Sequence, residues 1–175
     1  MIPRREQSAD GGNDMASEVQ AMRLWRRLGG TGFGRWLFTR IVCLKAPYFA
    51  SISPRLVCLE PGRCEAWLKQ RRRVQNHIGT VHAIALCNLA ELCAGLVTDV
   101  SIPRDMRWIP QDMTVRYLRK AAGRITAVAT PAMPLVTASD PYAATIAVTL
   151  TDEDGETVAS ADIHMWLSLR PGRKA

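Results

Sequence analysis

The segment that most constrains the fold of this chain is an apolar run near its middle. Residues 83–97 read AIALCNLAELCAGLV, and polar side chains interrupt the run only at Asn88 and Glu91. A stretch that is apolar on nearly every side is typical of a helix buried in the centre of a domain. A carboxylate in such a helix costs free energy unless it is paired or used, so Glu91 is the first candidate for a functional residue.

A polar tail and a helical extension are predicted ahead of this segment. Residues 1–17 are polar and aperiodic, which predicts a disordered tail. Residues 18–48 form an extension with helices near 17–28 and 33–44, because apolar side chains recur at helical spacing. The extension could lie on a membrane, but we expect it to pack against the chain's own domain, residues 49–171. The expected apolar faces carry Val19, Met22, Trp25 and Leu28 in the first helix, and Trp36, Leu37, Ile41 and Leu44 in the second.

A two-residue periodicity from residue 53 onward predicts an antiparallel sheet. Two strands precede the apolar helix and about four follow it. This order predicts an α+β fold in which a curved antiparallel sheet wraps around one long buried helix. Its open edges favour dimerisation through an edge strand. The expected elements are a hairpin of 54–59 and 63–69, a loop over 99–110, strands over 113–118 and 125–130, and a hairpin of 144–151 and 157–169 closed by Asp154-Gly155.

Composition narrows the class of protein. With 175 residues, of which 47% are hydrophobic, the chain suits one domain with a tail. No apolar run of spanning length and no signal-peptide pattern is visible, so no membrane span is expected. The cysteine usage favours a reducing cytoplasm. Five cysteines without C-x-x-C spacing, and two histidines five apart (His77 and His82), argue against disulfides and a metal site. The net charge of +7 favours a phosphate-bearing small molecule as partner, since no basic-aromatic nucleic-acid motif is visible.

The polar run before the helix carries a resemblance to a known family. The sequence NHIGTVHAIALCNLAE (76–91) resembles the N-x-x-G-T-x-H-G-G motif and following helical acid of hotdog-fold acyl-CoA thioesterases of the phenylacetate-pathway and 4-hydroxybenzoyl-CoA type. Residues 108–118 resemble the next strand of that family. Together with Lys45-Ala-Pro-Tyr-Phe, the motif also resembles a branch described as a domain of unknown function. The positions that match in identity and spacing are Asn76, Gly79, Thr80, His82 and Glu91.

The resemblance implies a hotdog fold and hydrolysis of an acyl-CoA, or a related acyl thioester, to a free acid and a thiol. By this resemblance Glu91 is the base or nucleophile, Asn76 orients the carbonyl or the attacking water, and Gly79 and His82 belong to the turn that shapes the site. A helix start also offers free N–H groups and a positive dipole end, so the amide of Ala83 is the expected oxyanion donor.

The resemblance also implies a homodimer, or a dimer of dimers, with active sites at the subunit interface. Glu91 would act on a substrate bound at the helix start of the partner. No separate cofactor is expected, since coenzyme A is part of the substrate. Its phosphates would contact basic side chains of the chain, and the candidates are Arg71, Arg73, Arg116 and Lys120.

The sequence departs from the family pattern at three places. Ala83 and Ile84 stand where the family has two glycines, and their side chains could crowd a thioester. The helper hydroxyl of the next strand is missing, because Pro110 lies near its place and Thr114 is the nearest hydroxyl. Asn88, one turn before Glu91, could either orient the carboxylate or merely satisfy it.

Structural explanations compete with these functional roles. Glu91 could pair with a sheet arginine such as Arg116, His82 could simply cap or pack the helix, and Asn76 could only stabilise a turn. Two other functions also fit the fold. The first is a non-catalytic protein that binds acyl thioesters, and the second is an acyl-thioester dehydratase, although the H-F-P-G-type loop of those enzymes is absent.

Overall fold

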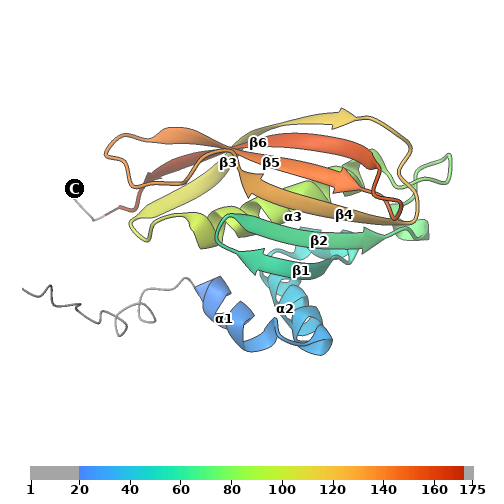
Figure 1. The fold of residues 1–175 in the computed structure, drawn as a ribbon, viewed down its shortest axis with the longest axis horizontal. Coiled ribbons are helices and arrows are strands. Elements are labelled where there is room, and N and C mark those ends of the chain that lie inside the picture. Colours follow the sequence, from blue (N-terminus) through green and yellow to red (C-terminus); the bar gives the residue numbers. More distant parts are fainter. Residues whose placement is uncertain (1–19, 172–175) are drawn as a thin grey trace, which may run out of the picture.

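The computed structural model describes residues 20–171, and the tail predicted over 1–17 lies outside them. Two helices come first, followed by two strands, a long helix and four strands (Figure 1). The elements are α1 (Gln20–Leu28), α2 (Gly32–Lys45), the 3₁₀ turn η2 (Pro47–Ile52), β1 (Arg55–Glu60), β2 (Arg63–Lys69), the 3₁₀ turn η3 (Arg72–Val74), α3 (Ala83–Ser101), β3 (Met106–Tyr117), β4 (Arg124–Pro131), β5 (Tyr142–Thr151) and β6 (Thr157–Leu169).

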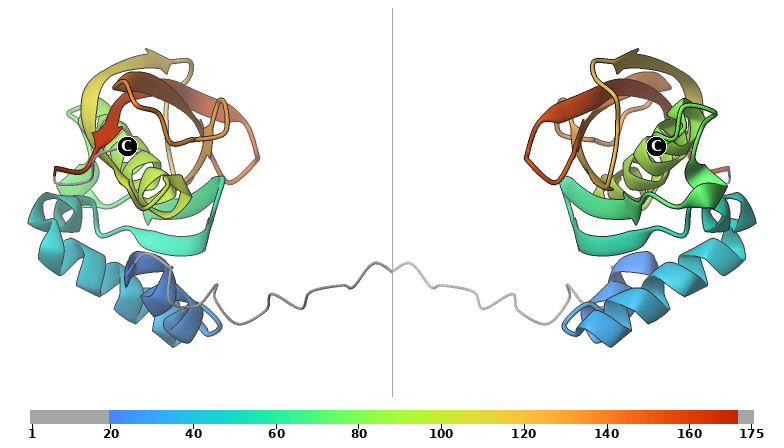
Figure 2. Two further views of the ribbon diagram at one scale, coloured as in Figure 1. Left: turned by 90° about the vertical axis from the view of Figure 1, so that its left-hand side faces the viewer. Right: turned by 90° about the vertical axis from the view of Figure 1, so that its right-hand side faces the viewer.

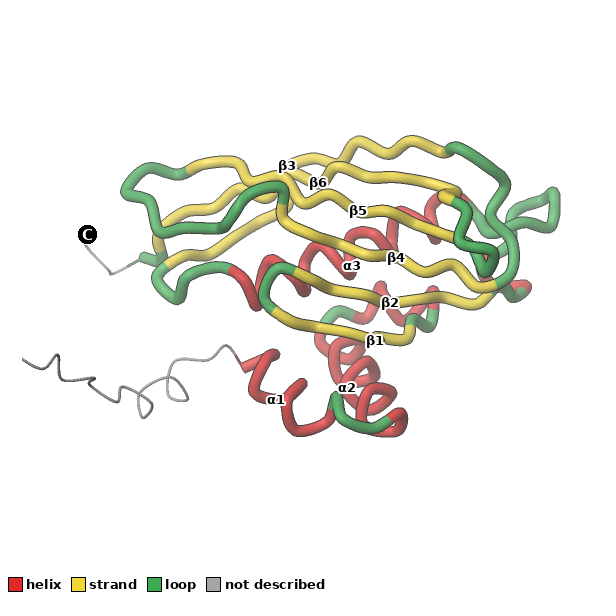
Figure 3. Tube along the Cα trace, viewed as in Figure 1, coloured by secondary structure: helices red, strands yellow, loops and turns green. Residues whose placement is uncertain are grey.

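The six strands form one antiparallel sheet in the order β1-β2-β4-β5-β6-β3. The end-on views show that the sheet curls around α3, and Figure 3 shows the long helix running beneath the strands (Figures 2 and 3). This α+β architecture is the one that the sequence predicts. Both predicted hairpins are present, and β1 and β3 are left as the two edges of the sheet.

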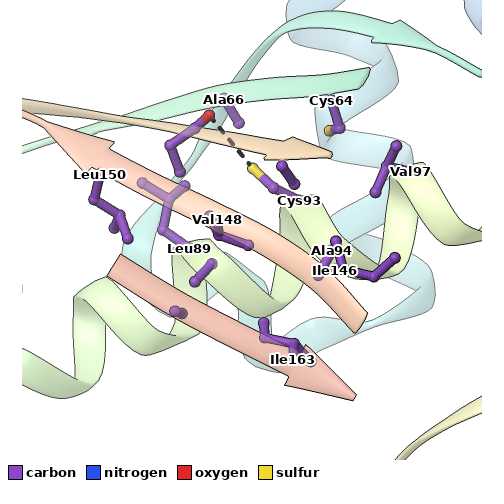
Figure 4. Close-up of a cluster of buried hydrophobic side chains, with 14 of the residues drawn as sticks. Cys64, Ala66, Leu89, Cys93, Ala94, Val97, Ile146, Val148, Leu150 and Ile163 are labelled. Carbon is purple, nitrogen blue, oxygen red and sulfur yellow. Dashed lines mark hydrogen bonds between the residues drawn. The ribbon is translucent and has the colours of Figure 1, made fainter. Parts of the chain in front are cut away.

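The core lies between the inner face of the sheet and α3. Every second residue of β2 is buried, as the period of two requires. In Figure 4 the side chains of Leu89, Cys93 and Val97 lie among those of β2, β5 and β6. By length and composition α3 could cross a membrane, but 61% of its apolar window is buried inside the fold. The sheet therefore accounts for the apolar character of this helix.

Helices α1 and α2 lie side by side below β1, at the edge of the sheet opposite β3 (Figure 1). The rings of Trp25 and Phe38 meet edge to face, with centroids 5.1 Å apart. The predicted face of α2 is wrong in part, because Phe38 and Cys43 are buried whereas Leu44 is 80% exposed. The helix carries apolar residues on both sides, so periodicity alone did not identify the side that packs.

The predicted loop over 99–110 is wrong at both ends. Helix α3 continues to Ser101, and β3 begins at Met106, which is fully buried. The proline and charged residues of this segment resemble a loop in composition. Pro110 is nevertheless tolerated in β3, because the strand is an edge and its pairing with β6 shifts register between Pro110 and Asp112.

Candidate active site

One side of α3 is left open or only partly covered by residues 20–171, and we refer to it as the uncovered side. Along this side, residues recur at intervals of four, as expected for neighbouring positions on a helix surface. Glu91 lies at its centre, and Ala83 lies at its start. The residues of α3 that are not buried are Ala83, Ile84, Cys87, Glu91, Gly95, Leu96, Asp99 and Ser101.

This uncovered side forms one wall of a cleft of about 1240 Å³. Helices α1 and α2 form a second wall, and the first half of β3 forms a third. The ring of Trp108 reaches over α3, and a methyl group at Gly95 would come within 3.1 Å of it. Apolar side chains such as Phe38, Ile41 and Leu92 share the lining with the cations of Arg23, Arg27 and Lys45 and with the carboxylate of Glu91. The cleft is therefore apolar with a basic bias, which suits an acyl group attached to an anion.

Glu91 is only partly buried, in contrast to the full burial expected from the sequence. Its carboxylate makes no hydrogen bond or ion pair with any residue between 20 and 171. The alternative of a pair with Arg116 is wrong, because Arg116 binds Asp162 across β3 and β6 at 3.1 Å. Asn88 does not orient Glu91 either, since its Nδ2 donates to Ser51 Oγ at 3.1 Å. The acid thus faces the cleft without a structural role within the described chain.

The start of α3 presents a free backbone donor. His82 is the N-cap, and its Nδ1 accepts a hydrogen bond from the N–H of Ile84 at 3.1 Å. The carbonyl of His82 accepts from Ala85 and Leu86. The N–H of Ala83 donates to no acceptor among the described residues. It is therefore available to an oxyanion at the positive end of the helix dipole.

The loop before α3 is organised by the side chain of Asn76. Its Oδ1 accepts from the N–H groups of Ile78 (3.1 Å) and Thr80 (3.0 Å), and its Nδ2 donates to Thr80 Oγ1 (2.8 Å). Gly79 has a φ of +81°, which the turn requires, and its carbonyl accepts from Gln70 Nε2 at 2.6 Å. These contacts support the turn-stabilising alternative for Asn76. They hold the loop that carries His82 and the helix start.

Three of the four predicted phosphate-binding residues lie near the loop that precedes α3. Arg73 precedes Val74, whose carbonyl accepts from His82, and Lys120 precedes Ala121, whose carbonyl accepts from Val81. The guanidinium of Arg71 donates to the carbonyls of Ile52 and Ser53, which fixes η2 beside this loop. The fourth cation, that of Arg116, is used in its ion pair with Asp162.

One chain does not bring all the predicted catalytic groups together. Asn76, Gly79, His82 and Ala83 meet at the start of α3. Glu91 lies eight residues further, which is a rise of about 12 Å along the helix axis. A carboxylate and an oxyanion donor that act on one carbonyl must both lie within about 3 Å of the reacting atoms. Within a single chain, therefore, Glu91 cannot serve the Ala83 amide.

Sequence reasoning missed two features of the site: the pair of Cys87 and Tyr117, and the contribution of α1 and α2 to the cleft. Cys87 lies midway between Ala83 and Glu91, and its Sγ is 3.0 Å from the hydroxyl of Tyr117 on β3. This hydrogen bond, together with burial, raises the pKa of Tyr117 to about 12. The i+4 spacing of Cys87 from both groups was a usable signal. The contribution of α1 and α2 to the cleft left no such signal, because it depends on how distant elements pack.

Comparisons with known proteins agree with the fold. A structural-genomics protein, APC5556, is 41% identical, with a TM-score of 0.73, and the match covers 86% of this chain and 98% of that one. A Pseudomonas aeruginosa protein of unknown function named a probable thioesterase, PA5026, is 26% identical over 73% of this chain and 91% of its own, with a TM-score of 0.61. A Haemophilus influenzae thioesterase, HI1161, is 15% identical over 72% and 87%, with a TM-score of 0.62, and shows the fold alone.

A search of curated proteins finds no significant match. The family model described as a domain of unknown function, DUF4442, matches residues 34–167, which is most of the chain. The match includes α3, its N-terminal loop and the six strands except the last two residues of β6. This agrees with the predicted resemblance to a hotdog branch of unknown function. The chain therefore has the hotdog fold and belongs to the DUF4442 family.

Proposed function

We propose that the protein hydrolyses an acyl-CoA, or a related acyl thioester, at a site shared between two copies of the chain. The observation that carries this proposal is the uncovered side of α3, which presents an unpaired carboxylate at Glu91 and a free amide at Ala83. Both groups are of the kind that thioester hydrolysis needs, a base or nucleophile and an oxyanion donor.

A dimer with two-fold symmetry accounts for the separation of these two groups. If the α3 helices of two copies pack antiparallel about Cys87, Glu91 of one copy lies opposite Ala83 of the other, because each is four residues from the centre. The free edge strand β3 supports such pairing, since it exposes Ile109 (61%) and Tyr117 (50%). Two equivalent sites would result.

In the proposed reaction, the thioester carbonyl oxygen accepts a hydrogen bond from the Ala83 amide. The Glu91 carboxylate of the other copy takes a proton from water, and the hydroxide adds to the carbonyl carbon. The tetrahedral oxyanion is stabilised at the helix start, and its collapse breaks the C–S bond. The thiolate leaves and takes up the proton held by Glu91, which restores the carboxylate. Direct attack by the Glu91 carboxylate, followed by hydrolysis of the anhydride, is the other route open to the same residues.

The cleft and the cations suggest how the substrate lies. The acyl group would occupy the apolar cleft beside α2 and β3. The phosphates of coenzyme A would lie outside it, near Arg73 and Lys120 at the start of α3. The P. aeruginosa relative named a probable thioesterase supports this class of reaction at 26% identity.

The decisive test is Glu91→Gln, assayed by thiol release from a panel of acyl-CoA esters of graded chain length. We expect turnover to fall by about a hundred- to ten-thousand-fold, because the amide can neither take the proton nor attack the carbonyl. The fold and the oligomeric state should be unchanged, as measured by circular dichroism and light scattering. Unchanged turnover in Glu91→Gln contradicts the proposed mechanism.

A second function is favoured by one observation at the helix start. The side chain of Ile84 is 54% exposed on the uncovered side of α3, where the resembling thioesterases have glycine. A bulky side chain there could hold a thioester without turning it over. A binding protein of this kind would be stabilised thermally by acyl-CoA while releasing no thiol in the trapping assay.

A further inference from the structure

The net charge of the chain is concentrated in the segment that contains α1, α2 and all of β1 except its last residue, Glu60. Residues 20–59 hold seven arginines and lysines and not one aspartate or glutamate. The chain as a whole has 23 basic and 16 acidic residues, so the remaining 16 basic and 16 acidic residues cancel. The whole formal charge of +7 is thus carried by this segment. A concentration of one sign over two adjacent helices produces an attractive field for anionic surfaces.

The outward side of α2 carries large apolar side chains in the middle of this positive segment. Phe33 is 71% exposed, Trp36 is 37% exposed and Leu44 is 80% exposed. With Arg40 they occupy positions 33, 36, 40 and 44, which fall on one side of a helix. The rings of Phe33 and Trp36 lie together, with centroids 5.4 Å apart. We refer to these four residues as the α2 stripe.

Packing among residues 20–171 does not explain the α2 stripe. The buried residues of α2 are Gly34, Phe38, Thr39 and Cys43, and the helix packs against α1, β1 and η2. Gly34 and Phe38 face away from the stripe, whereas Thr39 and Cys43 lie along its border. Tyr48, in η2 shortly after the end of α2, is also exposed (69%). Scattered exposed apolar residues are ordinary on protein surfaces, but an aligned row on one helix marks an interaction site.

We propose that the α2 stripe docks on the surface of an anionic lipid bilayer. Helices that bind such surfaces combine Trp, Phe and Leu on one side with basic residues around them and few acids. Trp and Tyr favour the headgroup level, where one end of the ring is apolar and the other is wet. Arg40 within the stripe and Lys45 beside Leu44 supply cations for lipid phosphates, and no acid within 20–59 opposes them.

The test is sedimentation of the full chain with vesicles, in parallel for phosphatidylcholine alone and for a mixture with phosphatidylglycerol. We expect binding to the mixed vesicles only, and weaker binding as salt is raised. The double variant Phe33→Gln/Leu44→Gln should lower partitioning by about tenfold, since two apolar side chains no longer insert. Arg40→Gln should lower it by about fivefold through the loss of one cation. Met133→Gln is the matched control, because Met133 is 72% exposed on the distant loop between β4 and β5.

Several results would overturn the proposal. They are an absence of binding to the mixed vesicles, equal binding to both vesicle types, and full binding by the double variant or by Arg40→Gln. A larger species in light scattering that the double variant abolishes, without any vesicle binding, would assign the stripe to a second copy of the chain instead. If the double variant does not fold, as judged by circular dichroism, Arg40→Gln alone decides.

Discussion

The Ala83 amide and the Glu91 carboxylate lie on the same uncovered side of α3 but eight residues apart, a rise of about 12 Å. This separation is too large for both to reach one carbonyl and suits two helices packed antiparallel. Each group can therefore be changed separately. One change removes the oxyanion donor at Ala83, and the other removes the base or nucleophile at Glu91.

Ala83→Pro removes the proposed oxyanion donor with little change to the helix. Ala83 is the first residue of α3, where proline is favoured, and His82 has φ −65° and ψ 138°, which a following proline permits. We expect thiol release to fall by about a hundred- to a thousandfold, while the thermal unfolding midpoint stays close to that of the wild type. Ala83→Gly is the control, since it keeps the N–H and removes only the methyl group. Equal activity in Ala83→Pro and Ala83→Gly would exclude the amide from catalysis.

Mixing the two inactive chains tests whether the site is shared. A heterodimer of Glu91→Gln and Ala83→Pro chains has one site with both changes and one site with neither. We therefore expect activity to return when the two chains are unfolded and refolded together, although each alone is inactive. Tandem tags allow the mixed species to be isolated and assayed. Failure of the isolated heterodimer to regain activity would mean that the two groups do not act across an interface.

The hydrogen bond between Cys87 and Tyr117 predicts a specific pH dependence. It raises the pKa of Tyr117 to about 12, with burial adding to the effect. Because the pKa in the fold is raised above the ordinary value of about 10, the associated stability is present below pH 10 and is lost as pH rises through about 12. In Cys87→Ala we expect the phenolate absorbance of Tyr117 to appear at lower pH. Tyr117→Phe identifies the transition that belongs to this residue, and an unmoved transition in Cys87→Ala would contradict the assignment.

Local patterns predicted most of this fold. The apolar run of α3 and the turn at Asp154-Gly155 are signals within a few residues of sequence, and both were identified correctly. β3 was shortened because Pro103 and Pro110 resemble loop residues, and only its position at the sheet edge makes Pro110 acceptable.

The candidate site was predictable only in part, for a similar reason. The motif around His82 is local, and so is the free amide of Ala83 that follows from a helix start. The cleft, in contrast, is lined by residues of α1, α2, η2, α3, β3 and β6, which span most of the described chain. The ion pair of Arg116 with Asp162 is likewise a contact between two strands, and the sequence does not specify it.

The corner between α1 and α2 depends on the absence of a side chain at Gly34. A methyl group there would lie 1.9 Å from the carbonyl oxygen of Leu28, so α1 would have to move. Gly34→Ala should lower the free energy of unfolding by about 1–3 kcal/mol, measured by urea denaturation. Gly32→Ala is the matched control, because nothing lies within 4 Å of its new methyl group, and it should raise stability by about 0.5 kcal/mol. Similar losses in both variants would show that the corner is not close-packed.

The amide of Asn88 is buried (5% exposed) and is hydrogen-bonded on one side only. Its Nδ2 donates to Ser51 Oγ, but its Oδ1 has no partner among the described residues. An orphaned acceptor contributes a desolvation cost, so replacing the whole amide by an apolar group of similar size removes a cost together with one hydrogen bond. We expect Asn88→Leu to leave the free energy of unfolding unchanged or to raise it by about 1 kcal/mol.

A comparison with Ser51→Ala shows whether Asn88 Oδ1 lacks a hydrogen-bond donor or accepts a hydrogen bond in solution. This variant keeps the amide and removes the partner of Nδ2, so it should destabilise the fold by about 1 kcal/mol. Both variants are compared in urea at several protein concentrations. If Asn88→Leu is instead the more harmful of the two, Oδ1 accepts a hydrogen bond in solution. A loss that grows as the protein is diluted would then identify the donor as a group on a second copy of the chain.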